Sequence, residues 1–165
     1  MPIKFNVKIT NQDMYRFHMY HMYRSFHGVF SIIAAIIAFV VAAVTWGDLS
    51  TSYTVLYVVF GIVFLFYFPV TLKLKAKSQI AMSEALKEAL EYEVDEEGIH
   101  VSQKGENACL QWKQVYKMVT TKHNVLIYSS RVNAYVIPRT IIGTQYQALK
   151  ELADSKLEKY QNCMK

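Results

Sequence analysis

Two long hydrophobic runs are the strongest pattern in the chain. No Lys, Arg, Asp or Glu lies between Arg24 and Asp48, and a helix over Gly28–Trp46 in that stretch would be about 28 Å long. The second run, Tyr53–Leu72, is also free of these residue types and would be about 30 Å long as a helix. Both lengths fit the hydrocarbon core of a bilayer. The sequence therefore predicts a transmembrane hairpin over residues 28–72, with spans at 28–46 and 53–72.

A signal peptide and a soluble helical hairpin fit these runs less well. A cleavable signal peptide has a shorter apolar core, whereas the first run here is long and begins at residue 28, behind a polar and aromatic stretch. A buried hairpin of a soluble protein normally carries a polar stripe on each helix, and neither run has one. We therefore expect the hairpin to cross a membrane.

The charges beside the runs predict their orientation. The loop between the spans contains one charged residue, Asp48, whereas basic residues flank the outer ends of both spans. These are Lys4, Lys8, Arg16 and Arg24 before the first span and Lys73, Lys75 and Lys77 after the second. Because cytoplasmic flanks are enriched in Lys and Arg, we expect a two-span cell-membrane protein with both termini in the cytoplasm.

Small residues predict how the two spans contact each other. Ala34, Ala38 and Ala42 recur at every fourth position and would share one helix face, with Gly61 as the expected contact on the second span. Pro69 lacks a backbone N–H group, so we expect the second helix to kink or end near this residue.

The segment before the hairpin has two different periods. Ile3–Ile9 alternates apolar and polar residues, which indicates a strand with one buried face. Thr10 or Asn11 can then cap a helix that carries Asp13 in its first turn and continues toward the first span. The strand needs a sheet to join, and we expect it to pair with the C-terminal one.

From residue 91 onward, short strand-like runs separated by turn residues predict an antiparallel sheet. The expected strands are Glu91–Val94, Ile99–Ser102, Leu110–Thr120, Val125–Tyr128 and Ala134–Ile137. Gly98 ends the first turn, where we expect it to take a positive φ, and Trp112 falls within the long third strand. Thr144 and Gln147 have the spacing of a capping box and predict a final helix. Its apolar face would consist of Tyr146, Leu149, Ala153, Leu157 and Tyr160.

The predicted fold class is an α+β membrane protein, in which a two-helix hairpin carries a small antiparallel β domain closed by a C-terminal helix. The expected parts are an N-terminal strand and juxtamembrane helix (1–27), the hairpin (28–72), a connecting helix (73–90) and a cytoplasmic β domain (91–165).

Composition narrows the function without defining it. Of the 165 residues, 53% are hydrophobic and 19% are charged, with a net charge of +5. The basic residues lie beside the spans and are not interleaved with aromatic residues in a patch, so we expect no nucleic-acid binding. Cys109 and Cys163 are far apart in the sequence and lack metal-ligand or redox spacing, so we expect two reduced thiols.

Several segments together resemble the YcxB-like family of bacterial membrane proteins. They are the two adjacent spans, the turn Glu96–Ile99, Trp112–Val115, Leu126–Tyr128, and Ile137–Arg139 before the final helix. The resemblance covers nearly the whole chain. It implies a short strand and helix, a two-span hairpin, and a C-terminal domain similar to small pleckstrin-homology-like (PH-like) barrels. It implies no established reaction and brings no catalytic residues.

A histidine- and methionine-rich segment precedes the first span. On a helix, Met14, His18 and Met22 share one face and His21 lies three residues from His18, so these side chains could hold a soft metal such as copper(I), or a haem. Such amphipathic side chains are also common in a helix at the level of the lipid head groups. Because spacing on a single helix is a weak motif, we assign no metal and no cofactor to it.

Motifs for catalysis do not appear in the sequence. The carboxylates between Glu91 and Glu97 lie in and beside an exposed turn, which is typical of a solvated charge run. The glycines are scattered singly and form no phosphate-binding loop, and no serine or cysteine has the context of a nucleophile elbow. We therefore assign no catalytic residues and expect the protein not to be an enzyme.

Basic residues suggest contact with lipid head groups. Lys73, Lys75 and Lys77 should meet an anionic inner leaflet, each contributing about 1 kcal/mol near the surface, although anchoring of the span also accounts for them. By analogy with the implied fold, we hypothesise that further basic residues extend this contact. They are Lys113, Lys117, Arg131 and Arg139.

The sequence thus predicts a non-enzymatic regulatory or accessory protein whose cytoplasmic domain binds a protein partner or the membrane surface. The alternative is a membrane enzyme with a dispersed active site at the inner interface, which a concave pocket with converging polar groups would favour. A transporter fits the sequence less well, because two spans without an intramembrane charge cannot line a polar pathway unless several copies assemble.

Overall fold

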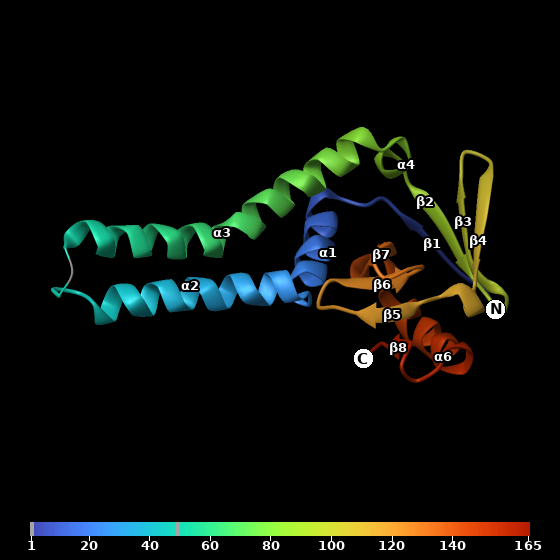
Figure 1. Cartoon of the computed structure of the whole chain (residues 1–165). Coiled ribbons are helices and arrows are strands. Elements are labelled where there is room, and N and C mark those ends of the chain that lie inside the picture. Colours follow the sequence, from blue (N-terminus) through green and yellow to red (C-terminus); the bar gives the residue numbers. More distant parts are fainter. Residues whose placement is uncertain (1, 49) are drawn as a thin grey trace. The chain divides into compact units, whose positions relative to one another are not determined.

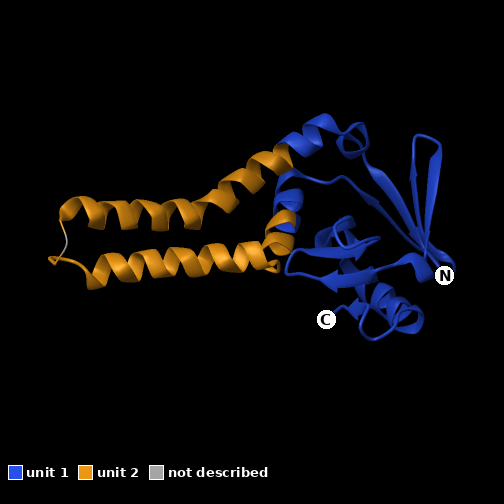
Figure 2. Ribbon diagram, in the orientation of Figure 1, with its two compact units in different colours: residues 1–17, 78–165 blue, residues 18–77 orange. Residues whose placement is uncertain are grey.

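The computed structural model describes residues 2–48 and 50–165, and its contacts divide the chain into two compact units (Figure 2). Unit 1 combines residues 1–17 with residues 78–165, and unit 2 consists of residues 18–77. Unit 1 is therefore built from segments that precede and follow unit 2 in the sequence. The two boundaries fall inside helices α1 (Asn11–Tyr23) and α3 (Thr51–Met82).

Unit 2 contains the predicted hairpin. Helix α2 (Phe26–Val44) and helix α3 are both long and apolar enough to cross a membrane. The first expected span therefore matches α2 closely, whereas α3 continues well beyond the second expected span. Figure 1 shows α3 changing direction part-way along its length, and Pro69 lies inside this helix. Loss of one helical hydrogen bond at a proline is a usual cause of such a bend.

Small residues bring the two helices together. The buried residues of α2 are Gly28, Ser31, Ala35 and Ala42. Ser31 Oγ donates a hydrogen bond to the backbone carbonyl of Phe64, which joins α2 to α3. The predicted face is thus correct at Ala42, but Ala34 and Ala38 are only half-buried. The contact face is rotated toward Ala35 because it follows the 3.6-residue helical period and not a strict interval of four.

The expected glycine contact on α3 has a different partner. A Cβ atom added to Gly61 would lie 2.7 Å from the ring of Phe39, so the glycine makes room for this ring and not for the alanines. Most other bulky apolar side chains of the hairpin are exposed, among them Ile36, Val40 and Phe66.

Sheet 1 of unit 1 joins the N-terminal strand to three strands from beyond the hairpin. Its order is β1 (Ile3–Val7), β2 (Leu90–Val94), β3 (Gly98–Gln103) and β4 (Glu106–Gln111), all antiparallel (Figure 1). Ile3 pairs with Val94 and Val7 pairs with Leu90. The prediction that the first strand pairs with the C-terminal sheet is therefore confirmed.

Sheet 2 follows directly in the sequence. It contains β5 (Lys117–Thr120), β6 (Asn124–Tyr128), β7 (Ala134–Pro138) and β8 (Asn162–Cys163), in the order β7-β6-β5-β8. The pairs among β5, β6 and β7 are antiparallel, whereas β8 runs parallel to β5. Helices α5 (Arg139–Ile142) and α6 (Tyr146–Lys156) connect β7 to β8.

Buried aromatic and aliphatic side chains hold unit 1 together. The ring of Tyr92 stacks on Phe5 at 5.5 Å between centroids and meets Tyr135 of sheet 2 edge-on at 5.9 Å. The largest fully buried side chains after Tyr92 come from both sheets and from α5 and α6, and include Ile99, Met118, Leu126, Ile127, Ile137, Ile142 and Leu149. Burial of each aliphatic side chain of this size stabilises the fold by about 1.5–3 kcal/mol.

The start of α1 is fixed by a reciprocal cap. Thr10 Oγ accepts the N–H of Asp13 at 3.2 Å, and Asp13 Oδ2 accepts the N–H of Thr10 at 3.2 Å. The capping role expected for Thr10 is confirmed. The buried amide of Asn124 in β6 donates to the Asp13 carbonyl at 3.3 Å, and Phe17 lies 6.2 Å from the Tyr128 ring. This part of α1 is therefore packed on sheet 2.

The prediction of a positive φ at Gly98 was wrong. The glycines with positive φ among the described residues are Gly47, Gly105 and Gly143. Gly98 is required for another reason, because a Cβ there would lie 2.4 Å from the Leu110 carbonyl oxygen of the neighbouring strand.

The long strand predicted over Leu110–Thr120 was also wrong. A short 3-10 helix at Trp112–Gln114 separates β4 from β5. The buried indole of Trp112 donates from Nε1 to the Asp95 carbonyl at 2.8 Å, and the side chain of Gln114 accepts the Gln111 N–H at 3.2 Å. These two bonds pair the indole N–H of Trp112 and the backbone N–H of Gln111 at the point where the chain leaves the strand.

Two helices have different ends in the structure from those that the sequence predicts. The helix expected over 73–90 consists of the end of α3 and the short α4 (Glu84–Lys87), and β2 begins at Leu90. The final helix begins at Tyr146 without a side-chain cap, so Thr144 does not form the expected capping box. Leu149, Ala153 and Leu157 are buried as predicted, whereas Tyr160 lies beyond the helix and is exposed.

Candidate functional site

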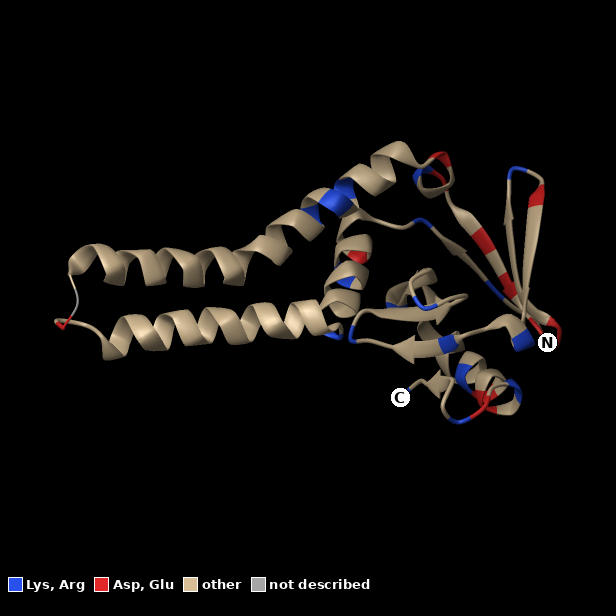
Figure 3. Ribbon diagram, in the orientation of Figure 1, with Lys and Arg blue, Asp and Glu red and all other residues tan. Residues whose placement is uncertain are grey.

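Charge is segregated between the two sheets of unit 1. Residues 90–111, which form β2, β3 and β4, contain one lysine and six acidic residues, Glu91, Glu93, Asp95, Glu96, Glu97 and Glu106. Residues 112–142, which include β5, β6 and β7, contain no Asp or Glu and five basic residues, Lys113, Lys117, Lys122, Arg131 and Arg139. Figure 3 shows red segments on β2 and β4 and a blue segment on β5, with blue segments also on β1. Strand β1 of sheet 1 carries Lys4, which forms an ion pair with Glu93 at 3.0 Å, so the acidic part of sheet 1 consists of β2, β3, β4 and their turns. This part of sheet 1 offers an acidic surface and sheet 2 a basic one.

The structure separates the basic residues that the sequence grouped for lipid contact. Lys117 begins β5 opposite Tyr128, and Arg131 lies in the loop that follows Tyr128, so these two basic residues share one end of sheet 2. Lys113 is exposed in the turn before β5. Arg139 follows Pro138, which pairs with Asn124 at the opposite end of β6.

Arg139 has a local structural role at that opposite end. Its N–H donates to the His123 carbonyl at 2.8 Å, and its guanidinium carbon lies 4.9 Å above the centre of the Tyr146 ring. This cation–π contact joins α5 to the start of α6. Lys73, Lys75 and Lys77 are exposed on α3 and belong to unit 2.

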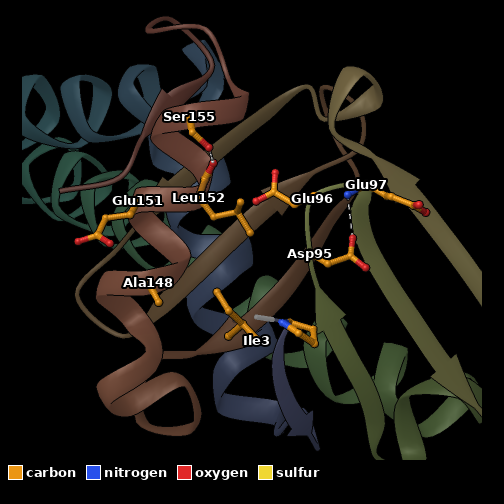
Figure 4. Close-up of a pocket in the computed structure, with 9 residues that line it drawn as sticks. Ile3, Asp95, Glu96, Glu97, Ala148, Glu151, Leu152 and Ser155 are labelled. Carbon is orange, nitrogen blue, oxygen red and sulfur yellow. Dashed lines mark hydrogen bonds between the residues drawn. The ribbon is translucent and has the colours of Figure 1, made fainter.

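An acidic cleft of about 580 Å³ lies between sheet 1 and α6 (Figure 4). Its lining residues are Pro2, Ile3, Asp95, Glu96, Glu97, Ala148, Glu151, Leu152 and Ser155. Lys156 forms an ion pair with Glu96 and neutralises part of the negative charge. Of the carboxylates expected to form a solvated run, Asp95, Glu96 and Glu97 therefore border a concave surface together with Glu151, which is far from them in sequence.

Asp95 shapes the turn beside this cleft. Its Oδ1 accepts the N–H group of Glu97 at 2.9 Å (Figure 4) and that of Gly98 at 3.1 Å. Partial burial by itself would raise the pKa of Asp95, but these two N–H donors and the nearby His100 imidazole together lower it below its ordinary value. Asp95 is therefore an ionised turn residue near neutral pH.

A second cluster joins Asp95 to His100 and Cys109. His100 Nε2 lies 3.2 Å from Asp95 Oδ2 and 4.0 Å from Cys109 Sγ, because His100 and Cys109 pair across β3 and β4. In a catalytic triad the acid and the nucleophile contact different nitrogens of the histidine. Here both approach Nε2, so the arrangement cannot relay a proton through the ring. The sequence analysis did not predict this cluster. Its signal in the sequence was the Lys104–Gly105 turn, which sets the register that pairs His100 with Cys109.

Met14, His18 and Met22 lie in the single helix α1 and keep the fourfold spacing that places them on one helix face. Met14 is buried within unit 1, whereas half-buried His18 and Met22 belong to unit 2. The Met22 carbonyl accepts a hydrogen bond from Ser25 Oγ at 2.6 Å. Within residues 2–48 and 50–165, no group of three or more His, Cys, Asp or Glu side chains could hold a metal ion.

Comparison with known proteins identifies the segment that contains most of these features. Residues 94–153 match the family model described as YcxB-like protein. This segment is YcxB-like. It extends from the end of β2 into α6 and contains β3 to β7, so the resemblance seen in the sequence is confirmed for these strands. The hairpin lies outside the matched residues. No curated protein and no solved structure matches the chain.

Proposed function

We propose that the protein is a two-span membrane protein, and that its YcxB-like unit works on the cytoplasmic surface as a non-enzymatic regulatory or accessory module. The observation that carries this proposal is the exposure of the hairpin. Only 22% of the apolar window of α2 and 11% of that of α3 is buried, which is the reverse of a core helix in a soluble protein. A bilayer would cover this apolar surface.

The basic flanks support the cytoplasmic placement of unit 1. The hairpin loop contains Asp48 as its charged residue, whereas lysines and arginines precede α2 and lie on α3. Because both flanks contribute to unit 1, both termini would lie on the same side of the membrane.

The order of elements in unit 1 supports a PH-like arrangement. Strands β1 to β4 form one sheet, β5 to β7 follow in a second sheet, and then comes helix α6, as expected for a small PH-like barrel; the two-residue β8 adds to the second sheet after α6. In this arrangement, the basic sheet is available for the membrane surface and the acidic sheet for a basic region of a partner protein.

Thiol labelling tests membrane placement and orientation together. Cys109 and Cys163 are both exposed in unit 1, so they report its side of the membrane. In sealed right-side-out vesicles, an impermeant maleimide should label neither cysteine until detergent is added. As a matched control, Asp48→Cys in a Cys109→Ser/Cys163→Ser background should be labelled without detergent. Labelling of the native cysteines in sealed vesicles would place unit 1 outside, and release of the protein by carbonate would contradict the membrane anchor.

Co-purification tests the accessory role. The full chain should be solubilised mildly from its native membrane, and the proteins and lipids recovered with it should be identified by mass spectrometry. A stoichiometric protein would identify the process in which the module acts. Recovery with bulk lipid alone would argue against a stable protein partner.

A second candidate function, a membrane enzyme with a dispersed site at the inner interface, is favoured by the acidic cleft. The cleft has the size of a small-molecule site, and carboxylates from two separate segments line it. Substitution Glu151→Gln changes one of these carboxylates, and Glu158→Gln outside the cleft is the matched control. Thermal shifts with a library of small cationic metabolites that depend on Glu151 but not on Glu158 would support this candidate, and an absence of shifts would count against it.

A further inference from the structure

Three exposed hydrophobic side chains gather at one end of sheet 2. After α3, the described residues contain three large hydrophobic side chains that are exposed, Tyr116 at 48%, Val132 at 62% and Tyr160 at 78%. They are far apart in the sequence, and each immediately precedes a strand or lies in a loop of sheet 2.

The strand register places all three at the same end. Tyr116 lies next to Lys117, which pairs with Tyr128, and the Tyr116 N–H donates to the Tyr128 carbonyl at 2.8 Å. Val132 lies in the loop that follows Tyr128 and leads to β7. Because β8 runs parallel to β5, Tyr160 also enters from this end. Neighbouring strands lie about 4.8 Å apart, so the three residues fall within about 15 Å along the sheet end.

The loop that carries Val132 is held in shape by hydrogen bonds. The N–H of Ser129 donates to the Asn133 carbonyl at 3.0 Å. Ser130 Oγ accepts the N–H groups of Val132 at 3.3 Å and Asn133 at 3.0 Å. These bonds close the loop on itself, so the valine remains exposed although it is apolar.

Basic residues lie beside each of the exposed hydrophobic residues. Lys117 is next to Tyr116, Arg131 is next to Val132, and Lys159 is next to Tyr160. The acidic residue nearest to them in sequence is Glu158. We call this set the sheet-end patch, which consists of Tyr116, Lys117, Arg131, Val132, Lys159 and Tyr160.

We propose that the sheet-end patch docks on the anionic surface of the bilayer, with Val132 and the two tyrosine rings entering the head-group layer. Tyrosine is enriched at this level of membranes, and basic side chains near an anionic surface are attracted to it. The inference rests on the membrane anchor proposed above, since the hairpin keeps the patch close to lipid at high effective concentration. Three hydrophobic side chains are too few for a stable protein interface, which buries about 800 Å² on each partner.

The test uses the full chain reconstituted in vesicles. An environment-sensitive fluorophore is attached to Val132→Cys in the Cys109→Ser/Cys163→Ser background. The matched control is Lys122→Cys, which is exposed in the β5–β6 turn at the opposite end of sheet 2. Vesicles contain either phosphatidylcholine alone or a mixture with phosphatidylglycerol, and each preparation is measured with and without lipids that carry a nitroxide quencher on the acyl chain.

The expected result is strong quenching at position 132 in the anionic vesicles, with little quenching at position 122. Lys117→Gln and Arg131→Gln should each lower the docking equilibrium constant about fivefold, which corresponds to about 1 kcal/mol per basic residue. Equal, weak quenching at positions 132 and 122 in both vesicles would overturn the proposal. Protection of position 132 from a water-soluble quencher without quenching by the labelled lipids would indicate contact with a second copy and would also overturn it.

A third position separates this inference from the membrane anchor itself. Ile36 is exposed in the middle of α2, so the fluorophore on Ile36→Cys should be quenched by the labelled lipids in both kinds of vesicle. If position 36 is not quenched, the proposed anchor fails. If position 36 is quenched and position 132 is not, the anchor stands and the docking of the sheet-end patch is excluded.

Discussion

The hydroxyl group of Tyr92 is buried and finds no hydrogen-bond partner among the residues that the structure describes. A buried polar group without a partner costs about 1–3 kcal/mol, whereas the Tyr92 ring is stabilising because it packs on Phe5 and Tyr135. Tyr92→Phe keeps the ring and removes the hydroxyl. We therefore expect this variant to be more stable by about 1 kcal/mol in thermal unfolding of the purified protein. A loss of stability would show that the hydroxyl has a partner in solution.

The same burial gives a pH dependence. Burial, with a smaller contribution from Tyr135, raises the pKa of Tyr92 above its ordinary value of about 10. Above pH 10 the unfolded chain therefore releases this proton while the folded chain keeps it, and stability falls as the pH rises. Urea unfolding between pH 9 and pH 11 should show a steeper loss for the native protein than for Tyr92→Phe. Parallel curves would contradict the raised pKa.

Gly98 and Gly105 are required for different reasons. At Gly98, an added Cβ would meet backbone atoms of β4, whereas Gly105 has a φ of 87° and open space around it. Gly98→Ala should therefore destabilise unit 1 by about 1–3 kcal/mol through overpacking. Gly105→Asn, the control, should have a small effect because asparagine tolerates a positive φ. Thermal unfolding of both variants measures the difference, and equal losses would argue against the close contact at Gly98.

At the scale of elements, β1 contributes a large part of the core of sheet 1. Ile3, Phe5 and Val7 are all buried against β2, and each should stabilise the fold by about 1.5–3 kcal/mol. We expect residues 78–165 made alone to exchange amide hydrogens rapidly in β2, and a peptide of residues 2–17 to restore protection. A peptide with Val7→Asp is the matched control. Full protection of the isolated fragment would show that β1 is dispensable.

Hydrophobic period and turn residues predicted the hairpin helices and most strands from the sequence. Strands β2, β3, β6 and β7 agree with the predicted runs within two residues, because each is a short run of strand-forming residues bounded by turn residues. The break at Trp112 and the short β8 could not be predicted. The first depends on a bond to the distant Asp95 carbonyl, and the second on a parallel pair with β5 formed only in the folded chain.

The candidate surfaces were predictable to different degrees. The absence of acidic residues between Glu106 and Glu151 can be read from the sequence and indicates a basic face. The shared position of Tyr116, Val132 and Tyr160 cannot, because only the register of sheet 2 brings them to one end. The placement of Arg139 and Lys117 at opposite ends of sheet 2 could not be read from the sequence for the same reason.

At the scale of the whole molecule, the proposed topology predicts a pattern of proteolysis. Proteinase K added to the cytoplasmic face of sealed vesicles should digest unit 1 and leave one protected fragment that contains both α2 and α3. Added to the outer face, it should cut the hairpin loop near Asp48 and separate the two helices. Mass spectrometry of the fragments distinguishes these results. A cytoplasmic digest that yields two separate helices would place the loop in the cytoplasm and contradict the proposed orientation.

The pairing of β1 with β2 links assembly of the whole molecule to the insertion of its helices. During synthesis, β1 leaves the ribosome long before β2, with the entire hairpin between them. If both helices cross the membrane, the two strands meet on one side and sheet 1 can close. If only one helix crosses, the strands are on opposite sides and β2 keeps an unpaired edge, the kind of surface that leads to aggregation. The fold of unit 1 would then act as a checkpoint for correct insertion, by which cellular quality control could distinguish complete molecules from misinserted ones.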